Sequence, residues 1–259
     1  MFVIALDGCL FMGEFAILME NVVKCFKDVV AVNGVSLKVA WGELFGLLGP
    51  NGAGKTTTVN MLCGLLKPTS GFVYIGGYDV RRENVKIKGL IGVCPQETAI
   101  YPYLTGEENV ELFGRLYALD KDTLRGRRSM LLEKLGLTQD ARRKVEKYSG
   151  GMKRRLSIVL ALIHNPQIIF LDEPTVGMDP QSRRAVWEFM RELKKEDKTI
   201  FLTTHYMEEA ESLCDRIGII DYGRLIALDQ PKNLISQNDV RNLEEVFIRL
   251  TGRRIREEI

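Results

Sequence analysis

One short stretch constrains this chain more than any other part of its sequence. It reads GPNGAGKTT and consists of Gly49, Pro50, Asn51, Gly52, Ala53, Gly54, Lys55, Thr56 and Thr57. The stretch satisfies the pattern G-x-x-x-x-G-K-S/T, whose structural context is a strand before it and a helix after it. The apolar run LFGLL precedes it, and apolar residues from Val59 to Leu66 follow at helical spacing. The sequence therefore predicts a strand, a glycine loop and a helix.

This arrangement is typical of a phosphate-binding site. Glycines allow successive backbone N–H groups to point inward, and the N-terminus of a helix adds partial positive charge there. In such loops the lysine, here Lys55, reaches the β- and γ-phosphates, and the next hydroxyl, here Thr56, supplies an oxygen to Mg²⁺. The alternative is a glycine-rich turn that matches by chance. It is disfavoured because the strand and helix signals are both in register.

Polar residues end two further apolar runs. IIFLDEP carries the paired carboxylates Asp172 and Glu173, and TIFLTTH ends in hydroxyls and His205. Both runs are interpreted as buried parallel strands, whose carboxyl ends meet at the sheet edge where ligands bind. We expect Asp172 to hold the metal, Glu173 to accept a proton from the attacking water, and His205 to hydrogen-bond the phosphate or the water. The alternatives are a solvated strand end before Pro174 and a structural histidine, which is how we interpret His164.

The remaining segments predict an α/β fold. Short β-branched runs separated by Asn33-Gly34 and Trp41-Gly42 indicate hairpins, and hence an antiparallel β piece before the glycine loop. From about residue 104 to residue 162, charged helices with apolar stripes predict an α-helical subdomain. Asn242 and Glu245 are spaced like a capping box in front of apolar residues at helical spacing, which predicts a short amphipathic terminal helix.

Composition excludes several classes of protein. With 36 Lys and Arg against 34 Asp and Glu, the chain lacks the global positive charge of a dedicated nucleic-acid binder. Its five cysteines are scattered without a CxxC pair, so neither a disulfide framework nor a zinc site is indicated, and we expect a reducing compartment. Basic residues outnumber acidic ones between residues 121 and 155. We interpret that run as a solvated helical face, with a surface near anionic lipid headgroups as the alternative.

The first 18 residues are mostly apolar, but Asp7 and Glu14 interrupt them and no basic region begins them. This pattern argues against a signal peptide and against a membrane-spanning helix. We expect an extra strand or a disordered extension here. Met12 and Met19 are both plausible starts, because the pattern that follows is complete from Met19 onward.

The stretch YSGGMKRRLS, residues Tyr148 to Ser157, comes before IIFLDEPTVGMDP. With the glycine loop, these stretches resemble the motifs of ATP-binding cassette (ABC) ATPases, in the order of that family, over residues 19–234. The resemblance implies a P-loop NTPase with a RecA-like parallel-sheet core, an N-terminal antiparallel β subdomain and an inserted α-helical subdomain at about residues 97–160. It places the ATPase domain at residues 19–237, between an extension (1–18) and an amphipathic helical tail (238–259).

Several site residues follow from the resemblance. Phe26 is similar to the aromatic residue that stacks on adenine, with ordinary strand packing as the alternative. Gln96 is similar to the glutamine that touches the metal and the nucleophilic water, and Asp179 to the aspartate that reaches the other subunit. The stretch YSGGMKRRLS is similar to the signature sequence of this family. In the family, each ATP lies between the glycine loop of one subunit and the signature sequence of another. The resemblance therefore implies that three signature residues bind nucleotide at a helix N-terminus, namely Ser149, Gly150 and Gly151.

Tyr148, Met152 and Met178 depart from the commoner residues of the family, but none of them removes a catalytic group. The signature, LTGEENVELFGRLYAL and the terminal NLEEVFIRLTGR are similar to the subfamily that powers exporters of drugs and lipids, including daunorubicin-type systems. This resemblance implies an ATPase that uses ATP and Mg²⁺ and works as a homodimer or heterodimer. It also implies separate transmembrane permease subunits, a place at the cytoplasmic face of the membrane, and no nucleic-acid partner.

Two alternatives remain at this point. A soluble ABC-type ATPase acting on nucleic acid or ribosomes usually carries tandem cassettes or long coiled coils, whereas this sequence shows one cassette and no heptad run. A regulatory nucleotide sensor without turnover is disfavoured by the presence of Glu173 and His205.

Overall fold

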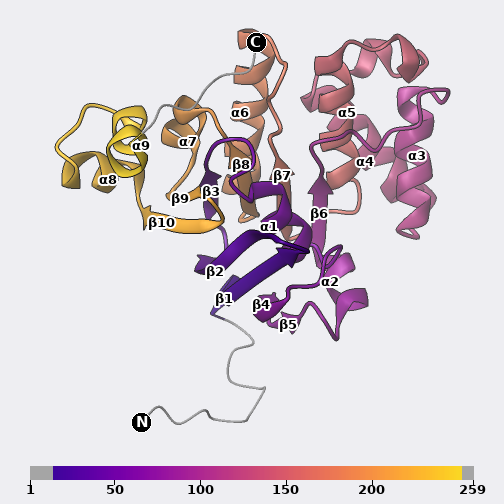
Figure 1. Cartoon of the computed structure of the whole chain (residues 1–259). Coiled ribbons are helices and arrows are strands. Elements are labelled where there is room, and N and C mark those ends of the chain that lie inside the picture. The colour runs from indigo at the N-terminus through magenta and orange to yellow at the C-terminus, as the bar shows by residue number, and fades with distance from the viewer. Residues whose placement is uncertain (1–13, 253–259) are drawn as a thin grey trace.

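The computed structural model describes residues 14–252 and contains two sheets (Figure 1). The first sheet has the strand order β2-β1-β4-β5 and is antiparallel. Its strands are β1 (Phe15–Phe26), β2 (Val29–Ala40), β4 (Ser70–Ile75) and β5 (Tyr78–Asp79). The second has the order β10-β9-β3-β8-β7-β6. Its strands are β3 (Leu44–Leu48), β6 (Ile91–Cys94), β7 (Ile168–Asp172), β8 (Thr199–Thr204), β9 (Arg216–Asp221) and β10 (Arg224–Asp229).

The second sheet is parallel except at β10, which pairs antiparallel with β9. Strands β3, β7 and β8 are buried along their whole length, which explains their continuous apolar runs. Alternate residues face opposite sides: Phe45 and Leu47 pack toward the antiparallel sheet and α1 (Lys55–Leu62), whereas Leu44 and Leu48 pack toward the helices on the other side. The predicted α/β fold with a parallel core is confirmed.

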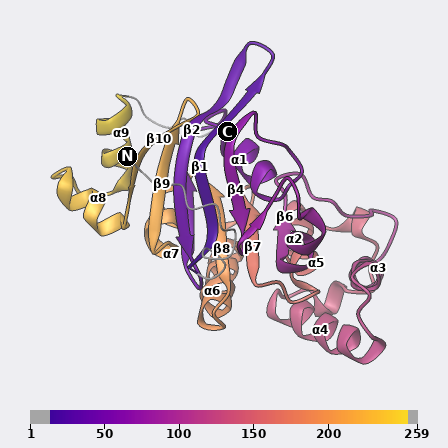
Figure 2. The ribbon, with the colours of Figure 1, turned by 90° about the horizontal axis from the view of Figure 1, so that it is seen from below.

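Helices flank this core on both sides. Three of them form the inserted helical subdomain: α3 (Gly106–Leu116), α4 (Lys121–Lys134) and α5 (Gly150–Leu162). Figures 1 and 2 show this group on one side of the strands and the last two helices on the other. The remaining helices are α2 (Asn84–Leu90), α6 (Pro180–Lys195), α7 (Met207–Leu213), α8 (Pro231–Gln237) and α9 (Leu243–Thr251).

Strand β1 begins four residues before the predicted start of the ATPase domain. Ala16, Ile17 and Leu18 are buried, and this end of β1 pairs with both β2 and β4. The predicted boundary at residue 18 therefore falls inside a strand of the sheet, because these apolar side chains complete its inner face. Residues 1–13 lie outside the described part of the chain.

The predicted hairpin at Asn33-Gly34 is wrong. Both residues lie within β2, where Gly34 has a φ of 70° beside an irregularity in the β1–β2 register. The connection is the two-residue turn of Lys27 and Asp28, a pair that is not among the common hairpin signals. The turn at Trp41-Gly42 exists, but it leads from β2 into β3 of the other sheet. A positive-φ glycine can thus serve a strand irregularity as well as a turn.

The terminal helix α9 forms as predicted. The Asn242 side chain accepts a hydrogen bond from the Glu245 N–H at 3.0 Å, which caps the helix. The Glu245 carboxylate accepts from the Arg241 N–H at 2.9 Å instead of returning to Asn242, so the capping box is not reciprocal. Leu243 and Phe247 are buried in the same core cluster as β3 and β7, which makes this part of the tail continuous with the core.

Within residues 14–252, no helix is long and apolar enough to cross a membrane. Four described cysteines are free thiols: Cys25, Cys63, Cys94 and Cys214. The fifth, Cys9, lies outside the described residues.

Candidate functional site

The glycine loop connects β3 to α1 at the carboxyl edge of the parallel sheet, and two of its glycines leave no room for a side chain. A Cβ atom at Gly49 would lie 2.3 Å from the Ile220 carbonyl oxygen, and one at Gly54 would lie 2.4 Å from the Ala31 carbonyl oxygen. Gly54 also has a φ of 105°. Glycine is therefore required at Gly49 by close approach, and at Gly54 by both close approach and backbone conformation.

Lys55 is buried inside this loop. Its Nζ donates to the carbonyl oxygens of Gly49 at 2.8 Å and Pro50 at 3.1 Å. The same Nζ lies 3.0 Å from Glu173 Oε1, and both side chains are almost fully buried. The lysine is thus held with its charge directed at one carboxylate oxygen, in the position expected for a phosphate-binding lysine.

Glu173 follows β7 directly and is fixed from several directions. Its N–H donates to the carbonyl oxygen and to Oγ1 of Thr203, each at 3.1 Å, and its backbone has a φ of 51°. His205 Nδ1 lies 3.3 Å from Glu173 Oε1. Burial alone would raise the pKa of this carboxyl, but the hydrogen bond with His205 and the charge of Lys55 outweigh it and lower the pKa to about 2. Glu173 is therefore an ionised carboxylate in this state.

The predicted metal-binding side chains lie at the same edge of the sheet. Asp172 is buried at the end of β7, where it accepts a hydrogen bond from Thr203 Oγ1 of the neighbouring strand β8. Thr56 Oγ1 lies 3.5 Å from Gln96 Oε1, which joins the start of α1 to the loop after β6. Among the described residues, no three His, Cys, Asp or Glu side chains gather into a metal site. A magnesium ion here would be held by the oxygens of Thr56, Gln96 and Asp172 together with phosphate oxygens or water.

A cavity of about 370 Å³ opens beside these groups. Its lining includes eight of the predicted site residues: Asn51, Gly52, Gly54, Lys55, Thr56, Thr57, Gln96 and Glu173. Gly49 and Pro50 instead contribute the carbonyl groups that hold Lys55, and Ala53 is buried behind the loop. The structure thus brings most of the predicted catalytic and phosphate-binding residues to one cavity.

The signature segment, Ser149 to Gly151, is placed differently. The Ser149 side chain accepts from the Met152 N–H at 3.2 Å and caps α5. Gly150 lines a second cavity of about 240 Å³, which adjoins the first because Gln96 and Glu173 line both. A Cβ atom at Gly150 would meet no other atom within 4 Å. Gly150 therefore faces open space, whereas a Cβ atom at Gly151 would lie 3.9 Å from Met178 Cγ.

Two other predicted residues lie away from the cavity lining. Asp179 caps α6, where its side chain accepts from the Ser182 N–H at 2.9 Å. Phe26 lies at the last pair of the β1–β2 hairpin, opposite Val29, and its ring is 45% exposed with Lys24 Nζ 4.9 Å from the ring centre. Neither residue lines the cavity at the glycine loop.

Sequence reasoning missed two residues that support the site. Thr203 hydrogen-bonds both the Asp172 side chain and the Glu173 N–H. The two hydroxyls at the end of TIFLTT indicated a polar strand end. Only the register of β7 against β8 shows that Thr203, and not Thr204, pairs with Asp172. Glu209 on α7 is fully buried and accepts from Thr175 Oγ1 and Trp187 Nε1, each at 2.8 Å. It ties the helix after His205 to the turn after Glu173, and burial raises the pKa of its carboxyl. Nothing in its local sequence distinguishes it from its acidic neighbours.

Known proteins share both the sequence and the fold of this chain. The family model described as ABC transporter matches residues 32–176. The linearmycin resistance ATP-binding protein of Bacillus subtilis is 47% identical over 84% of this chain and 70% of its own length. A daunorubicin resistance ATP-binding protein of Streptomyces coeruleorubidus is 45% identical over 83% of this chain and 68% of its own length. A Nod factor export ATP-binding protein of Paraburkholderia xenovorans is 43% identical over 91% of this chain and 78% of its own length.

Solved structures are similar over nearly their whole length. An ATP-binding subunit of an ABC transporter superposes with a TM-score of 0.84 at 29% identity and covers 91% of this chain and 99% of its own. A dimeric ATP-binding cassette in a post-hydrolysis state, bound to ADP and Pi, superposes with a TM-score of 0.76 at 28% identity and covers 83% of this chain and 98% of its own.

Proposed function

Because the chain belongs to the ABC transporter family, we propose that the cavity at the glycine loop binds the triphosphate of ATP and that the side chains around it direct hydrolysis. The chain is an ATP-hydrolysing nucleotide-binding subunit of that family. The observation that carries the proposal for the site is the convergence of Lys55, Gln96, Glu173 and His205 from four separate segments onto one sheet edge.

The residues present fit a nucleotide triphosphate and a magnesium ion. The glycine loop presents N–H groups and the buried Lys55 ammonium to an anion, and the Glu173 carboxylate already lies beside that ammonium as one anionic partner. Thr56, Gln96 and Asp172 offer the oxygen ligands that Mg²⁺ prefers. When bound, Mg²⁺ would neutralise part of the phosphate charge and orient the phosphates.

The ion pair between Lys55 and Glu173 gives the site a defined order of events. Phosphate oxygens compete with the Glu173 carboxylate for the Lys55 ammonium, because both are anions that need the same buried cation. Once Lys55 turns to phosphate, the Glu173 carboxylate keeps its contact with His205 but loses the Lys55 charge that also lowers its pKa. It then becomes a stronger base, still held by Thr203 and adjacent to His205, and can accept a proton from water.

We also propose that the site is completed by a second cassette. Gly150 faces open space, and the family includes a cassette solved as a dimer, so Ser149, Gly150 and Gly151 would approach the phosphates bound by another copy. Asp179 would contact that copy, and the exposed ring of Phe26 would stack on adenine. Either a homodimer or a heterodimer satisfies this geometry.

The relatives support the role of an exporter. Their names describe resistance to linearmycin and daunorubicin and export of Nod factor, so we propose that this subunit powers export of a drug-like or lipid-like compound. Separate transmembrane permease subunits would bind it and hold it at the cytoplasmic face of the membrane. The alternative of an ATPase acting on nucleic acid or ribosomes is not favoured by these relatives.

The test of the active-site assignment is Glu173→Gln, compared with Glu208→Gln, an exposed glutamate on the nearby α7. We expect Glu173→Gln to lower kcat by roughly a hundredfold or more, because it removes the proton acceptor, while ATP binding persists. ATP-bound dimers should accumulate in size-exclusion chromatography or X-ray scattering. Glu208→Gln should behave as wild type. Undiminished phosphate release by Glu173→Gln would refute its role.

The membrane partner is tested separately by isolating the chain from native membranes and identifying what co-purifies. We expect an integral membrane protein, released when the membranes are dissolved but not when they are treated with nuclease. Recovery with ribosomes or nucleic acid instead would overturn the exporter assignment and leave the ATPase assignment untouched.

A further inference from the structure

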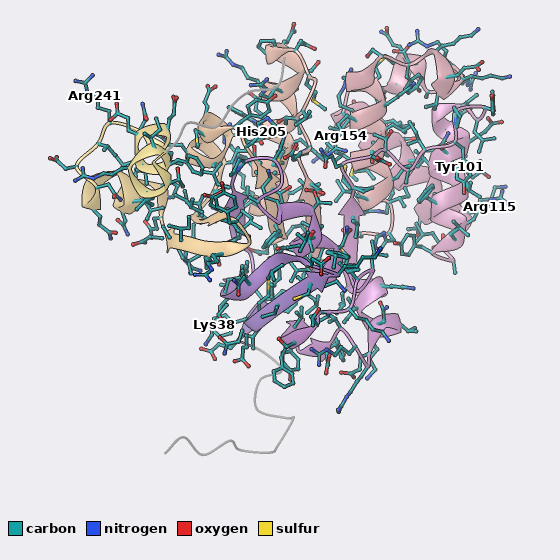
Figure 3. All side chains as sticks on the ribbon, in the orientation of Figure 1. Lys38, Tyr101, Arg115, Arg154, His205 and Arg241 are labelled. Carbon is teal, nitrogen blue, oxygen red and sulfur yellow. The ribbon has the colours of Figure 1, made fainter. Side chains whose placement is uncertain are left out.

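Arg154 is a buried arginine in the second turn of α5, and its side chain leaves the helical subdomain to enter the core (Figure 3). It is 5% exposed. Its guanidinium donates to four backbone carbonyl groups: Nε to Pro174 at 3.2 Å, one terminal nitrogen to Gln96 at 2.9 Å and to Pro95, and the other to Asp172. All four acceptors are far from Arg154 in sequence.

These acceptors belong to the two segments that carry the proposed metal and water chemistry. Pro95 and Gln96 directly follow β6, whereas Asp172 ends β7 and Pro174 lies in the turn after it. Strands β6 and β7 are parallel neighbours, but their hydrogen-bonded register ends at Cys94 and Leu171. Beyond that point Arg154 bonds to both segments at once.

We propose that Arg154 is a positioning residue for catalysis, which fixes the Gln96 loop against the end of β7 and ties both to the signature helix α5. The proposal rests on the functions proposed above for Gln96 and Asp172. Arg154 does not line the cavity at the glycine loop, although it lines the adjoining cavity beside Gly150. It acts through the backbone of Gln96, which lines both cavities, and through that of Asp172 at the end of β7.

The chemistry of the four contacts requires an arginine. A guanidinium carries five N–H donors in a rigid planar fork, so it can serve carbonyl groups on two segments without losing its geometry. A lysine has three donors on one nitrogen and would reach fewer of these carbonyls. Replacing Arg154 with lysine would keep the positive charge but release the loop after β6 or the end of β7. The substitution therefore separates the effect of charge from the effect of positioning.

Kinetics of ATP hydrolysis by the full chain test this role. We expect Arg154→Lys to lower kcat by about tenfold to a hundredfold, since small displacements of catalytic groups have effects of that size. The KM for ATP should change little, because the glycine loop is untouched. The matched control is Arg127→Lys: Arg127 donates to the Ile163 and Leu162 carbonyls near the end of α5 that is remote from the site, and it should leave kcat unchanged.

A double-mutant cycle with Gln96→Ala tests whether Arg154 acts through Gln96. Once the Gln96 side chain is gone, we expect Arg154→Lys to lower kcat by a clearly smaller factor than it does in the wild-type chain. An undiminished effect in the Gln96→Ala background would overturn the proposal. So would an equal loss of kcat in Arg127→Lys and Arg154→Lys, because it would indicate a general loss of packing around α5.

Amide hydrogen exchange of the nucleotide-free chain provides a readout that does not depend on turnover. We expect Arg154→Lys to increase exchange at the amides of residues 96–98, while exchange in the interior of β7 and β8 stays at its wild-type level. If the lysine variant does not fold, the same exchange measurement is made on Arg154→Gln. Unchanged exchange at residues 96–98 would overturn the positioning role. A wild-type rate of ATP hydrolysis for Glu173→Gln would instead refute the proposed function and leave the exchange result standing.

Discussion

The glycine loop and the signature segment both place glycines at the start of a helix, but their surroundings differ. In the glycine loop, the backbone of Ala31 and Ile220 excludes a Cβ atom at Gly54 and Gly49. At Gly150, no described atom outside its chain neighbours and its own helix backbone lies within 4 Å of the place a Cβ would take. The fold of this chain therefore explains the glycines of the first region and not the glycine of the second.

This difference indicates where each half of the proposed site is completed. The glycine loop is closed by the chain itself, with Lys55 paired to Glu173 across it. The signature segment is held by the Ser149 cap and by the helix α5 that it begins. A glycine without a steric reason inside its own chain is expected where another molecule approaches closely, which is the position that the dimer proposal gives to Gly150.

The largest expected effect belongs to Gly54→Ala. It combines a Cβ clash with the Ala31 carbonyl and a φ of 105°, so we expect the chain to lose about 3 kcal/mol or more of stability and to lose ATP binding. Gly52→Ala is the matched variant, because Gly52 has a φ of 78° but open space around it, and it should cost about 1–2 kcal/mol of stability. Denaturant unfolding measures both. Equal losses of stability in the two variants would mean that backbone strain, and not the close approach of the Ala31 carbonyl, accounts for the requirement for glycine at residue 54.

Gly150→Ala should separate folding from activity. We expect its stability to stay within about 0.5 kcal/mol of wild type, because alanine suits the start of a helix and nothing is displaced. ATPase activity should fall by roughly tenfold or more, since the added methyl group would disturb the approach of a partner's nucleotide. Gly126→Ala in α4, which is also surrounded by open space, should leave ATPase activity unchanged. Full ATPase activity of Gly150→Ala would contradict the proposal that a partner's nucleotide approaches closely at Gly150.

The ion pair that closes the glycine loop predicts a pH dependence in the nucleotide-free chain. The folded pKa of Glu173 lies at about 2, below its usual value of 4.5, so the stabilisation is complete above pH 4.5 and is lost as the pH falls toward 2. We expect the stability difference between wild type and Glu173→Gln to shrink over that range. Urea unfolding of both proteins at several pH values measures it. A constant difference would show that the charge pair does not stabilise the loop.

The smallest expected effect concerns Ser149. Its side chain caps α5 through the Met152 N–H, so Ser149→Ala should cost about 1 kcal/mol of stability. Ser149→Asp keeps a capping oxygen and should retain most of that stability, while its charge would oppose an approaching phosphate. If Ser149→Asp hydrolysed ATP like wild type, the signature segment would have no anionic partner.

Much of the site could be predicted because its residues form short local patterns. The glycine loop, the carboxylates after β7 and the histidine after β8 each follow an apolar strand, and parallel strands end at the same edge. The Asn33-Gly34 pair misled the prediction of the first hairpin, because the same dipeptide suits a turn and a strand irregularity. The local sequence pattern indicates which backbone conformations a residue tolerates. The strands that pair with it decide whether that conformation forms a turn or a strand irregularity.

By itself, the sequence determined the family, the parallel core and the residues most suited to phosphate and metal. Only the tertiary structure decided the partners of those residues: Lys55 with Glu173, Thr203 with Asp172, and Arg154 with the carbonyls of two strand ends. The physical reason is that these contacts join segments far apart in the chain, and strand register sets them. A one-residue shift of β8 against β7 would turn the Thr203 side chain to the opposite face of the sheet and leave the carboxylates without it.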